Sequence, residues 1–292
     1  MNVWDKIAED ISAATGEAFS IDEQRGVGGG CINDATRVHG GGRSYFVKLN
    51  SADQLDMFLA EAEGLAEMAA AKAVRVPEPV CYGTAGAQAY LVMEDLDLGG
   101  HESGELLGRQ LAEMHRTTRA QFGWHRDNTI GSTPQINTPS DDWVEFWREH
   151  RLGFQLELAA RHGHGGALQR SGERLMAEMG AFFTDHHPEA SLLHGDLWSG
   201  NYAATGEGEP VIFDPAVYYG DREADIAMTE LFGGFPRAFY SAYNEAWPLD
   251  AGYKVRKVFY NLYHILNHLN LFGGGYASQA GRMIDQLLAE LR

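Results

Sequence analysis

The sequence has 292 residues, 44% of them hydrophobic, a length that favours two lobes or domains over a single core. No run of about 18 uncharged apolar residues occurs, and the opening segment MNVWDKIAED lacks the basic and apolar blocks of a signal peptide, so we expect a cytoplasmic protein with no membrane partner. The formal net charge of −18 repels phosphate backbones, which argues against a nucleic-acid partner, and two cysteines are too few for a disulfide framework.

The first hundred residues predict a β-rich lobe that follows one short helix. Residues 3–15 carry apolar side chains at helical spacing, and residues 18–50 alternate strands with glycine turns. Residues 53–71 predict a second helix with an apolar face. Two prolines then exclude a helix from the segment VRVPEPVCYG, and AQAYLVMEDL predicts an apolar strand.

After Gly99 and Gly100 the sequence becomes mainly helical, and we place the domain boundary there, with lobes at residues 1–98 and 99–292. An island of turns and short strands, residues 191–221, interrupts the helices of the second lobe. The expected class is therefore α+β, with a β-rich N-lobe and a mainly α-helical C-lobe. Helices of the second lobe are expected at residues 103–119, 141–162, 166–186, 221–231, 253–272 and 276–291.

A glycine-rich loop, GVGGGCIND, lies between two predicted strands of the first lobe. Its central glycines Gly28, Gly29 and Gly30 would let backbone N–H groups approach a negatively charged ligand. The alternative is a flexible turn without a ligand. Because a strand rather than a helix follows the loop, a Rossmann dinucleotide site and a Walker P-loop are both disfavoured.

Lys48 lies in the predicted strand YFVKLN, on the same face as Phe46. A strand lysine is often a solvated edge residue, and that alternative stands for Lys48 alone. The next helix offers two carboxylates that could hold the ammonium in place. Glu61 lies closer than Glu63 to the apolar stripe of that helix, so we expect Lys48 to pair with Glu61.

The stretch LHGDLWSGN places Asp196 and Asn201 five residues apart, and Asp214 follows the short apolar strand VIF. A solvated turn would explain the polar residues of LHGDLWSGN, but not its Leu and Trp. Asp and Asn oxygens suit Mg²⁺, which takes its remaining ligands from water and phosphate. Together with Lys48 and the glycine loop, these residues predict phosphoryl transfer.

The spacing from Asp196 to Asn201 equals that of the protein-kinase pattern H-R-D-x-x-x-x-N. Gly195 replaces the arginine of that pattern, so the loop offers no partner for a phosphorylated activation segment. We therefore expect activity without such regulation.

The segments FVKLN, HGDLWSGN and IFDPAVYYGDREADIAM resemble the fructosamine kinase (ketosamine 3-kinase) family, within the aminoglycoside phosphotransferase group of protein-kinase-like folds. The resemblance runs from the glycine loop to Tyr276. The tryptophan of HGDLWSGN, the GDRE motif and residues 122–159 are similar to this narrower family.

This resemblance implies ATP- and Mg²⁺-dependent phosphorylation of a sugar hydroxyl on a ketosamine, a fructosamine or ribulosamine, either free or bound to a protein. It implies that Asp196 is the catalytic base and that Asn201 and Asp214 hold magnesium. Lys48 and Glu61 would hold ATP. The adenine would meet the backbone of four further residues, Met93, Glu94, Asp95 and Leu96.

The resemblance also suggests roles around the catalytic loop. The acceptor is expected to face four side chains, those of Trp198, Asn128, Gln135 and Asn137. Asp221 and Asp225 are expected to support the catalytic loop by accepting its hydrogen bonds, and His194 to support it from within. For Asp221 an alternative is a helix N-terminal carboxylate favoured by the dipole.

Other interpretations stay open. A related kinase for an aminoglycoside or an amino alcohol such as choline is the main alternative, and a nucleotide-binding pseudokinase is the second. Cys31 in the glycine loop could be redox-active, because amide dipoles favour its thiolate, or could simply fill a turn. The histidines at 161–166 and 186–188 are expected to be exposed, and a monomer is favoured.

Overall fold

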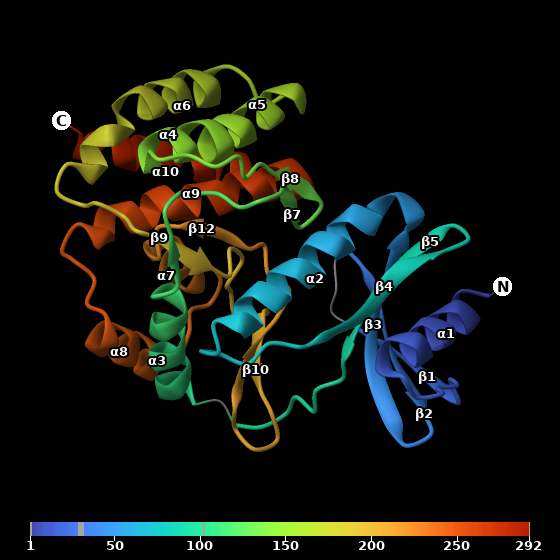
Figure 1. The fold of residues 1–292 in the computed structure, drawn as a ribbon. Coiled ribbons are helices and arrows are strands. Elements are labelled where there is room, and N and C mark those ends of the chain that lie inside the picture. The colour runs from blue at the N-terminus through green and yellow to red at the C-terminus, as the bar shows by residue number, and fades with distance from the viewer. Residues whose placement is uncertain (1, 29–31, 102, 292) are drawn as a thin grey trace. The chain divides into compact units, whose positions relative to one another are not determined.

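The computed structural model describes residues 2–28, 32–101 and 103–291, which divide into two compact units (Figure 1). Unit 1 comprises Met1–Ser103 and Tyr202–Pro215, and unit 2 comprises Gly104–Asn201 and Ala216–Arg292. The predicted boundary at Gly99–Gly100 is close to the first passage of the chain between the units. The assignment of residues 202–215 to the second lobe, however, differs from the observed division.

Unit 1 is built on a five-stranded antiparallel sheet in the order β1-β2-β3-β5-β4. Its elements are α1 (Val3–Thr15), β1 (Glu23–Val27), β2 (Asp34–Gly40), β3 (Arg43–Ser51), the 3₁₀ turn η1 (Ala52–Gln54), α2 (Leu55–Ala70), β4 (Pro79–Ala85) and β5 (Gln88–Glu94). The predicted helices and the order of strand, turn and hairpin are confirmed.

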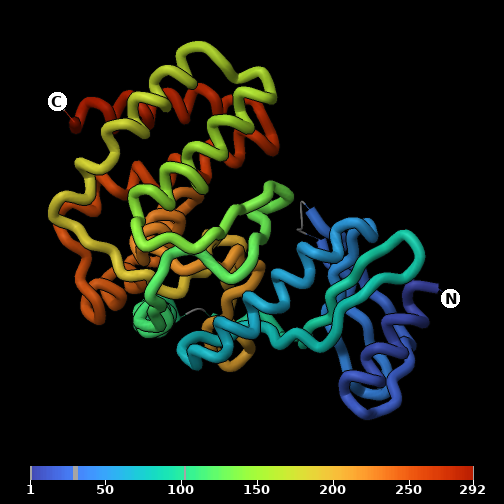
Figure 2. Tube along the Cα trace, turned by 45° about the horizontal axis from the view of Figure 1, so that its top comes forward, coloured from blue at the N-terminus to red at the C-terminus, as the bar shows by residue number. Residues whose placement is uncertain are grey.

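The two helices of unit 1 pack on opposite faces of this sheet (Figure 2). Ile7 and Ile11 of α1 form a core with Val47 of β3 and Val92 of β5. Because side chains alternate along a strand, Lys48 points to the other face, where α2 lies. Because Val47 packs against α1, the next residue, Lys48, lies on the face of β3 that is turned away from α1.

A hairpin from later in the chain, β10 (Tyr202–Ala204) and β11 (Pro210–Ile212), belongs to unit 1. The amide of Ile212 donates to the carbonyl of Arg75 at 3.0 Å, and the amide of Gly99 donates to Ala204 at 3.0 Å. A two-stranded ribbon has unpaired edges, and unit 1 supplies their partners. These long-range bonds are why the local sequence did not reveal the assignment.

Unit 2 is mainly helical, as predicted. Its helices are α3 (Gly104–His115), α4 (Trp143–Trp147), the π-helical segment η2 (Arg148–Gly153), α5 (Phe154–Arg161), α6 (Ala167–Glu178), the 3₁₀ helix η3 (Met179–Phe183), α7 (Glu223–Thr229), α8 (Arg237–Ala246), α9 (Tyr253–Phe272) and α10 (Tyr276–Glu290). The helix α8 was not predicted.

Short strands complete unit 2. They are β6 (Thr118–Arg119), β7 (Asn128–Ile130), β8 (Thr133–Gln135), β9 (Ala190–Leu193) and β12 (Tyr218–Gly220). The strands β12, β9 and β6 form one sheet, and β7 pairs with β8. The stretch HGDLWSGN starts directly after β9, so this small sheet holds one end of that loop.

The core of unit 2 gathers around α9, where Phe259, Tyr260, Ile265 and Leu266 are fully buried. Trp147 of α4 stacks edge-on against Tyr260, with ring centroids 4.9 Å apart. Such aromatic packing gives a rigid base for the loops of this unit. None of the described helices is both long and apolar enough to cross a bilayer.

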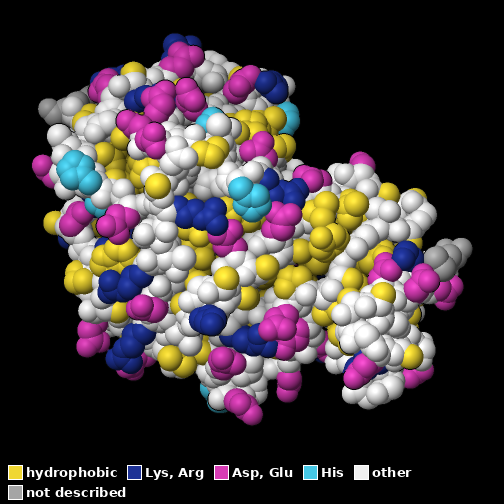
Figure 3. All heavy atoms as spheres, in the orientation of Figure 1, with side chains coloured by type: hydrophobic (Ala, Val, Ile, Leu, Met, Phe, Trp, Pro, Cys, Tyr) yellow, Lys and Arg dark blue, Asp and Glu magenta, His cyan; other side chains and the backbone are white. Residues whose placement is uncertain are grey.

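The negative charge of the chain is spread over its surface. Figure 3 shows one face, on which Asp and Glu side chains alternate with Lys and Arg side chains. No single block of acidic residues explains the net charge of −18, as the scattered sequence distribution already indicates.

Candidate active site

Lys48 is held between two carboxylates in unit 1. Its Nζ atom lies 2.5 Å from Oε1 of Glu61 on α2 and 2.6 Å from Oδ1 of Asp214, which follows β11. The pairing with Glu61, and not Glu63, is as predicted. The lysine is buried, while the Asp214 side chain is 48% exposed. The buried ammonium is therefore fixed from behind by Glu61 and presented beside a carboxylate that solvent can reach.

This arrangement keeps the lysine charged. Burial alone would lower the pKa of Lys48, but the carboxylates of Asp214 and Glu61 outweigh it and raise that pKa above its ordinary value. Burial raises the pKa of Glu61, and the Lys48 ammonium opposes that increase. An ammonium that stays charged and is held in one place is well suited to bind phosphate oxygens.

Asp214 has a left-handed backbone conformation, with φ of +58°. Non-glycine residues rarely adopt this conformation, and strain of this kind gathers at functional sites. The side chain leaves the end of β11 at a sharp turn as a result. Together, the turn and the ion pair with Lys48 fix the direction of one exposed carboxylate.

The predicted catalytic loop, residues 194–201 of unit 2, brings Asp196 and Asn201 together. The Nδ2 group of Asn201 donates to the backbone carbonyl of Asp196 at 2.8 Å and lies 3.4 Å from Oδ2 of the same residue. Since the amide nitrogen makes both contacts, Oδ1 is the atom of Asn201 that suits a metal ion. The amide of Asp196 in turn donates to Nδ1 of His194 at 3.2 Å, so His194 supports the loop from within.

Gly195 cannot be replaced by the arginine of the protein-kinase pattern. Its φ is +82°, and a Cβ atom there would lie 2.0 Å from the carbonyl oxygen of Ala216. The loop and the chain after Asp214 approach each other closely here, since the amide of Ala216 donates to the carbonyl of His194 at 2.8 Å. Only glycine allows this contact.

Asp225 of α7 supports the catalytic loop as predicted. Its carboxylate accepts the amides of His194 at 2.7 Å and Gly195 at 2.9 Å. Burial alone would raise the pKa of Asp225, but the hydrogen bond from His115 and the loop amides lower it. Asp225 therefore stays ionised and holds the loop through charge-assisted hydrogen bonds.

The same prediction for Asp221 is wrong. Its carboxylate accepts the amide of Glu223 at 3.0 Å and the hydroxyl of Tyr260 at 2.5 Å, and it lies 2.7 Å from Nε2 of His186. Within the part of the chain that the structure describes, no amide of the loop donates to it. Asp221 thus caps the start of α7, as the helix-dipole alternative suggested. Asp221 and Asp225, four residues apart at the start of α7, thus bind different groups: Asp225 binds the loop amides, and Asp221 binds the helix start and Tyr260.

The four residues expected to face the acceptor separate into two groups. Trp198 is 37% exposed, and its indole lies close to Gly200, where a Cβ atom would come within 2.4 Å of the ring. Its exposure fits the predicted role.

Asn128, Gln135 and Asn137 are instead buried. Their side chains bond to one another and to the backbone of unit 2, so they do not face an acceptor in this structure. Their position is internal because β7 and β8 form a hairpin that turns these amides inward, a feature that spacing along the chain does not reveal.

In the predicted adenine segment, residues 93–96, two side chains form ion pairs with arginines. Glu94 pairs with Arg75 and Asp95 pairs with Arg37, the latter at 2.6 Å. Met93 is buried at the end of β5. Adenine contact with the backbone of Met93–Leu96 stays a prediction. Gly28 is exposed at the end of β1, whereas Gly29, Gly30 and Cys31 lie outside the described residues.

Comparison with known proteins shows the family. The fructosamine kinase family model matches residues 3–290. The chain belongs to the fructosamine kinase family. It is 51% identical over 288 residues to the "Probable ketoamine kinase" of Synechocystis sp., covering 98% of this chain and 97% of the relative. It is 47% identical to the chloroplastic "Protein-ribulosamine 3-kinase" of Arabidopsis thaliana over 283 residues, 95% of this chain and 86% of the relative.

A solved structure supports the same assignment. The "Putative fructosamine-3-kinase" of Haemophilus somnus superposes with a TM-score of 0.90 at 29% identity, covering 98% of this chain and all of the other. This fructosamine kinase family member has the protein-kinase-like fold predicted from its sequence. The family resemblance predicted from the glycine loop to Tyr276 is confirmed over residues 3–290.

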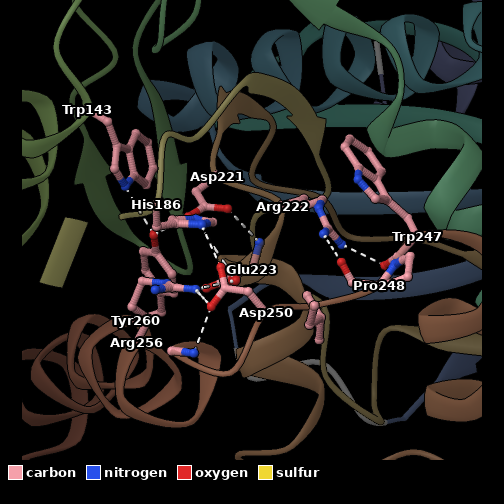
Figure 4. A network of polar contacts seen from close by, with 12 residues as sticks. Trp143, His186, Asp221, Arg222, Glu223, Trp247, Pro248, Asp250, Arg256 and Tyr260 are labelled. Atoms are coloured by element: carbon pink, nitrogen blue, oxygen red, sulfur yellow. Dashed lines mark hydrogen bonds and ion pairs between the residues drawn. The ribbon is translucent and has the colours of Figure 1, made fainter. Parts of the chain in front are cut away.

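The GDRE motif of this family member is part of a polar network that includes Arg256, His186 and Asp250 (Figure 4). Arg256 of α9 binds both carboxylate oxygens of Glu223, at 2.7 and 2.9 Å, and Oδ1 of Asp250 at 2.7 Å. His186 bridges Asp221 and Asp250 and is partly buried, so its prediction as an exposed histidine is wrong. The positive charge between Glu223 and Asp250 is the Arg256 guanidinium, so these residues act as a structural clamp.

His115 of α3 is a supporting residue that the sequence did not reveal. Its Nε2 lies 3.2 Å from Asp225, and its Nδ1 lies 2.8 Å from the hydroxyl of Tyr243. Burial lowers the pKa of His115 despite the hydrogen bond with Asp225. A neutral imidazole thus orients the carboxylate that holds the catalytic loop. A single histidine at the end of a predicted helix carries no sequence signal of this role.

Proposed function

We propose that this chain is an ATP-dependent kinase that phosphorylates a sugar hydroxyl of a ketosamine, with Mg²⁺ as its metal cofactor. The observation that carries the proposal is the placement of Lys48, which is buried, charged and bonded to both Glu61 and Asp214. A buried lysine held by two carboxylates has little structural advantage over an apolar residue. It is the arrangement that nucleotide phosphates require in protein-kinase-like enzymes.

The donor set fits magnesium. Asp214 offers a partly exposed carboxylate on a left-handed backbone turn, and Asn201 carries an amide oxygen in addition to the nitrogen that donates to Asp196. Hard oxygen donors of this kind suit Mg²⁺. When bound, the ion would neutralise phosphate charge and so favour transfer of the γ-phosphoryl group.

The protein groups then have separate tasks. Lys48 binds phosphate oxygens, and Glu61 keeps its ammonium from turning away. Asp196 orients the acceptor hydroxyl and takes its proton. A bond forms between the acceptor oxygen and the γ-phosphorus, the bond from that phosphorus to the bridging oxygen breaks, and ADP leaves. The barrier of the reaction is lowered by the positioning of the reacting groups and by neutralisation of charge.

Trp198 is the proposed contact for the acceptor sugar. It lies two residues after Asp196, and its amide donates to the carbonyl of Asp196 at 3.2 Å. Phe232 packs edge-on against the indole, with centroids 6.3 Å apart, and His268 lies 4.7 Å from Phe232. Such a row of rings can pack against the C–H face of a sugar and attract the protonated amine of a ketosamine.

The relatives suggest which acceptors to test first, since their names include ketoamine kinase and ribulosamine 3-kinase. Turnover of ATP should be measured with ribulose-lysine, fructose-lysine, choline and kanamycin side by side. We expect the highest kcat/KM with one of the two ketosamines. Faster turnover of choline or kanamycin would replace the proposed substrate class, and no turnover with any acceptor would favour a pseudokinase.

A further inference from the structure

Arg151, on the π-helical segment η2, is a fully buried guanidinium. No carboxylate among the described residues forms an ion pair with it. It donates to the carbonyl of Ile136 at 2.6 Å and to Oδ1 of Asn137 at 2.8 Å. Aromatic faces attract its charge, since its Cζ atom lies 4.2 Å from the ring centroid of Tyr218 and 4.7 Å from that of Phe146.

A buried charge of this kind is costly for the fold, so its retention calls for a reason. The Nε atom of Arg151 even lacks a hydrogen-bond partner. A planar fork of donors can reach two consecutive residues, Ile136 and Asn137, which neither lysine nor an apolar side chain could do. Burial of Arg151 therefore serves to fix the orientation of the Asn137 side-chain amide.

The helix that carries Arg151 is built to place it. Residues Arg148–Gly153 form a π-helical turn, and such turns occur frequently at functional sites. At Gly153 a Cβ atom would lie 2.5 Å from the carbonyl oxygen of Arg148, so this turn depends on a glycine. The extra residue of the π turn shifts the direction of Arg151 relative to a regular helix.

From Asn137 a chain of amides leads to the segment after Asp214. The Nδ2 group of Asn137 donates to Oδ1 of Asn128 at 2.8 Å, and the Nδ2 group of Asn128 donates to the carbonyl of Val217 at 2.8 Å. Gln135 donates to Oδ1 of Asn128 at 2.9 Å and to the carbonyl of Ala216 at 3.0 Å. All of these groups are buried, so each bond is protected from water.

Ala216 and Val217 connect both candidate loops. They follow Asp214 and Pro215 directly in the chain, and Asp214 has the strained left-handed conformation. The amide of Ala216 also donates to the carbonyl of His194 in the catalytic loop. Two anchored carbonyls and one anchored amide thus hold the residues on which the conformation of Asp214 and the entry to the catalytic loop depend.

We propose that Arg151 is a positioning residue for phosphoryl transfer, which acts through Asn137, Asn128 and Gln135 to fix the chain after Asp214 against the catalytic loop. This role rests on the proposed kinase function. It also assigns the three amides a task other than contact with the acceptor.

Hydrogen exchange tests the relay without any substrate. Arg151→Met removes the donors and keeps an apolar stem. Asn137→Asp keeps the acceptor for Arg151 but removes the donor to Asn128. Both variants should exchange faster in peptides that cover residues 194–197 and 214–219, with protection elsewhere unchanged. Arg161→Met, which loses an exposed i,i+4 pair on α5, should match the wild type.

Kinetics then test the role in the reaction. With ribulose-lysine as acceptor, Arg151→Met and Asn137→Asp should lower kcat roughly tenfold to a hundredfold, with a smaller change in the KM of the acceptor, because small misplacements of catalytic groups have effects of this size. Arg151→Lys should restore less than half of the lost kcat, since one ammonium nitrogen lacks the rigid planar fork with which Nη1 and Nη2 of Arg151 each bond one acceptor.

The contrary results are distinct. Wild-type kcat in a folded Arg151→Met enzyme would overturn the proposal. A second combination of results would also overturn it. In that case, Arg151→Met shows faster hydrogen exchange throughout unit 2, while Asn137→Asp has wild-type exchange and wild-type kcat, because Arg151 would then only support the core. If Arg151→Met does not fold, Asn137→Asp alone decides. Failure of the wild type to phosphorylate any ketosamine would count against the proposed function, while the exchange experiment would still test the relay.

Discussion

At the scale of single residues, the most informative contact is the one between Lys48 and Asp214. Their ion pair lies within unit 1 and joins a strand to a residue 166 positions later in the chain. The exposed part of Asp214 is the part that a metal–nucleotide complex would use. Sequence predicted Lys48 from its strand face and the nearby helical carboxylate of Glu61, and Asp214 because a carboxylate at the end of a buried strand is costly unless it meets a cation.

Asp214→Ala should abolish the effect of Mg²⁺ on nucleotide binding. For the wild type, we expect calorimetric titration with ADP to give tighter binding when Mg²⁺ is present. The variant should bind ADP equally with and without the ion, because an essential oxygen ligand is gone. Glu9→Gln, which removes an exposed carboxylate on α1, is the matched control and should behave as the wild type. An undiminished Mg²⁺ effect in Asp214→Ala would contradict the assignment.

At the scale of elements, the catalytic loop depends on close backbone contact. Gly195→Ala should destabilise the protein by about 3 kcal/mol or more, because the new methyl group meets the carbonyl of Ala216 and the backbone is left-handed. Gly41→Ala is the matched control, since Gly41 is also left-handed but has open space around it. It should cost about 1 kcal/mol. Urea unfolding measures both, and equal losses would contradict the steric argument.

Helix α9 carries a buried histidine that makes stability depend on pH. Burial lowers the pKa of His264 from 6.5 to about 3. In the unfolded chain the group binds a proton below about pH 6.5, whereas the folded protein does not until much lower pH. The free energy of unfolding should therefore fall by about 2 kcal/mol between pH 7 and pH 5 through this group alone.

The variant His264→Leu isolates that contribution. His186 has a raised pKa and acts in the opposite direction, so only the difference between the wild type and the variant is diagnostic. The variant should lose about 2 kcal/mol less than the wild type when urea unfolding is compared at pH 7 and pH 5. The same loss in both proteins would show that His264 is not buried in its neutral form.

The elements also show where prediction from sequence succeeded and failed. Helices with a continuous apolar stripe, such as α2 and α9, were predicted close to their observed bounds. The helix α8 was missed, and the hairpin β10–β11 was assigned to the wrong unit because its partners, Arg75 and Gly99, are distant in the chain. The inward direction of Asn128 and Gln135 depends on a hairpin of two three-residue strands, too short for a periodic signal.

At the scale of the whole molecule, the chain passes between the units at residues 103–104, 201–202 and 215–216. Asn201 ends one segment of unit 2, and Asp214 lies at the end of the hairpin of unit 1. Asn201 and Asp214, the two proposed magnesium ligands, thus lie in the sequence within two residues of points where the chain crosses from one unit to the other. Sequence predicted the residues and their chemistry, but the division of the chain depends on long-range hydrogen bonds.

The most direct test of the proposed reaction is transfer of labelled γ-phosphate from ATP to ribulose-lysine by the wild type and by Asp196→Asn. Asp185→Asn, which changes an exposed aspartate, serves as the control for charge. We predict phosphorylated ketosamine from the wild type and the control, and a loss of about 10²- to 10⁴-fold in rate for Asp196→Asn with its fold intact. Equal transfer by Asp196→Asn, or no transfer to a ketosamine by the wild type, would contradict the account.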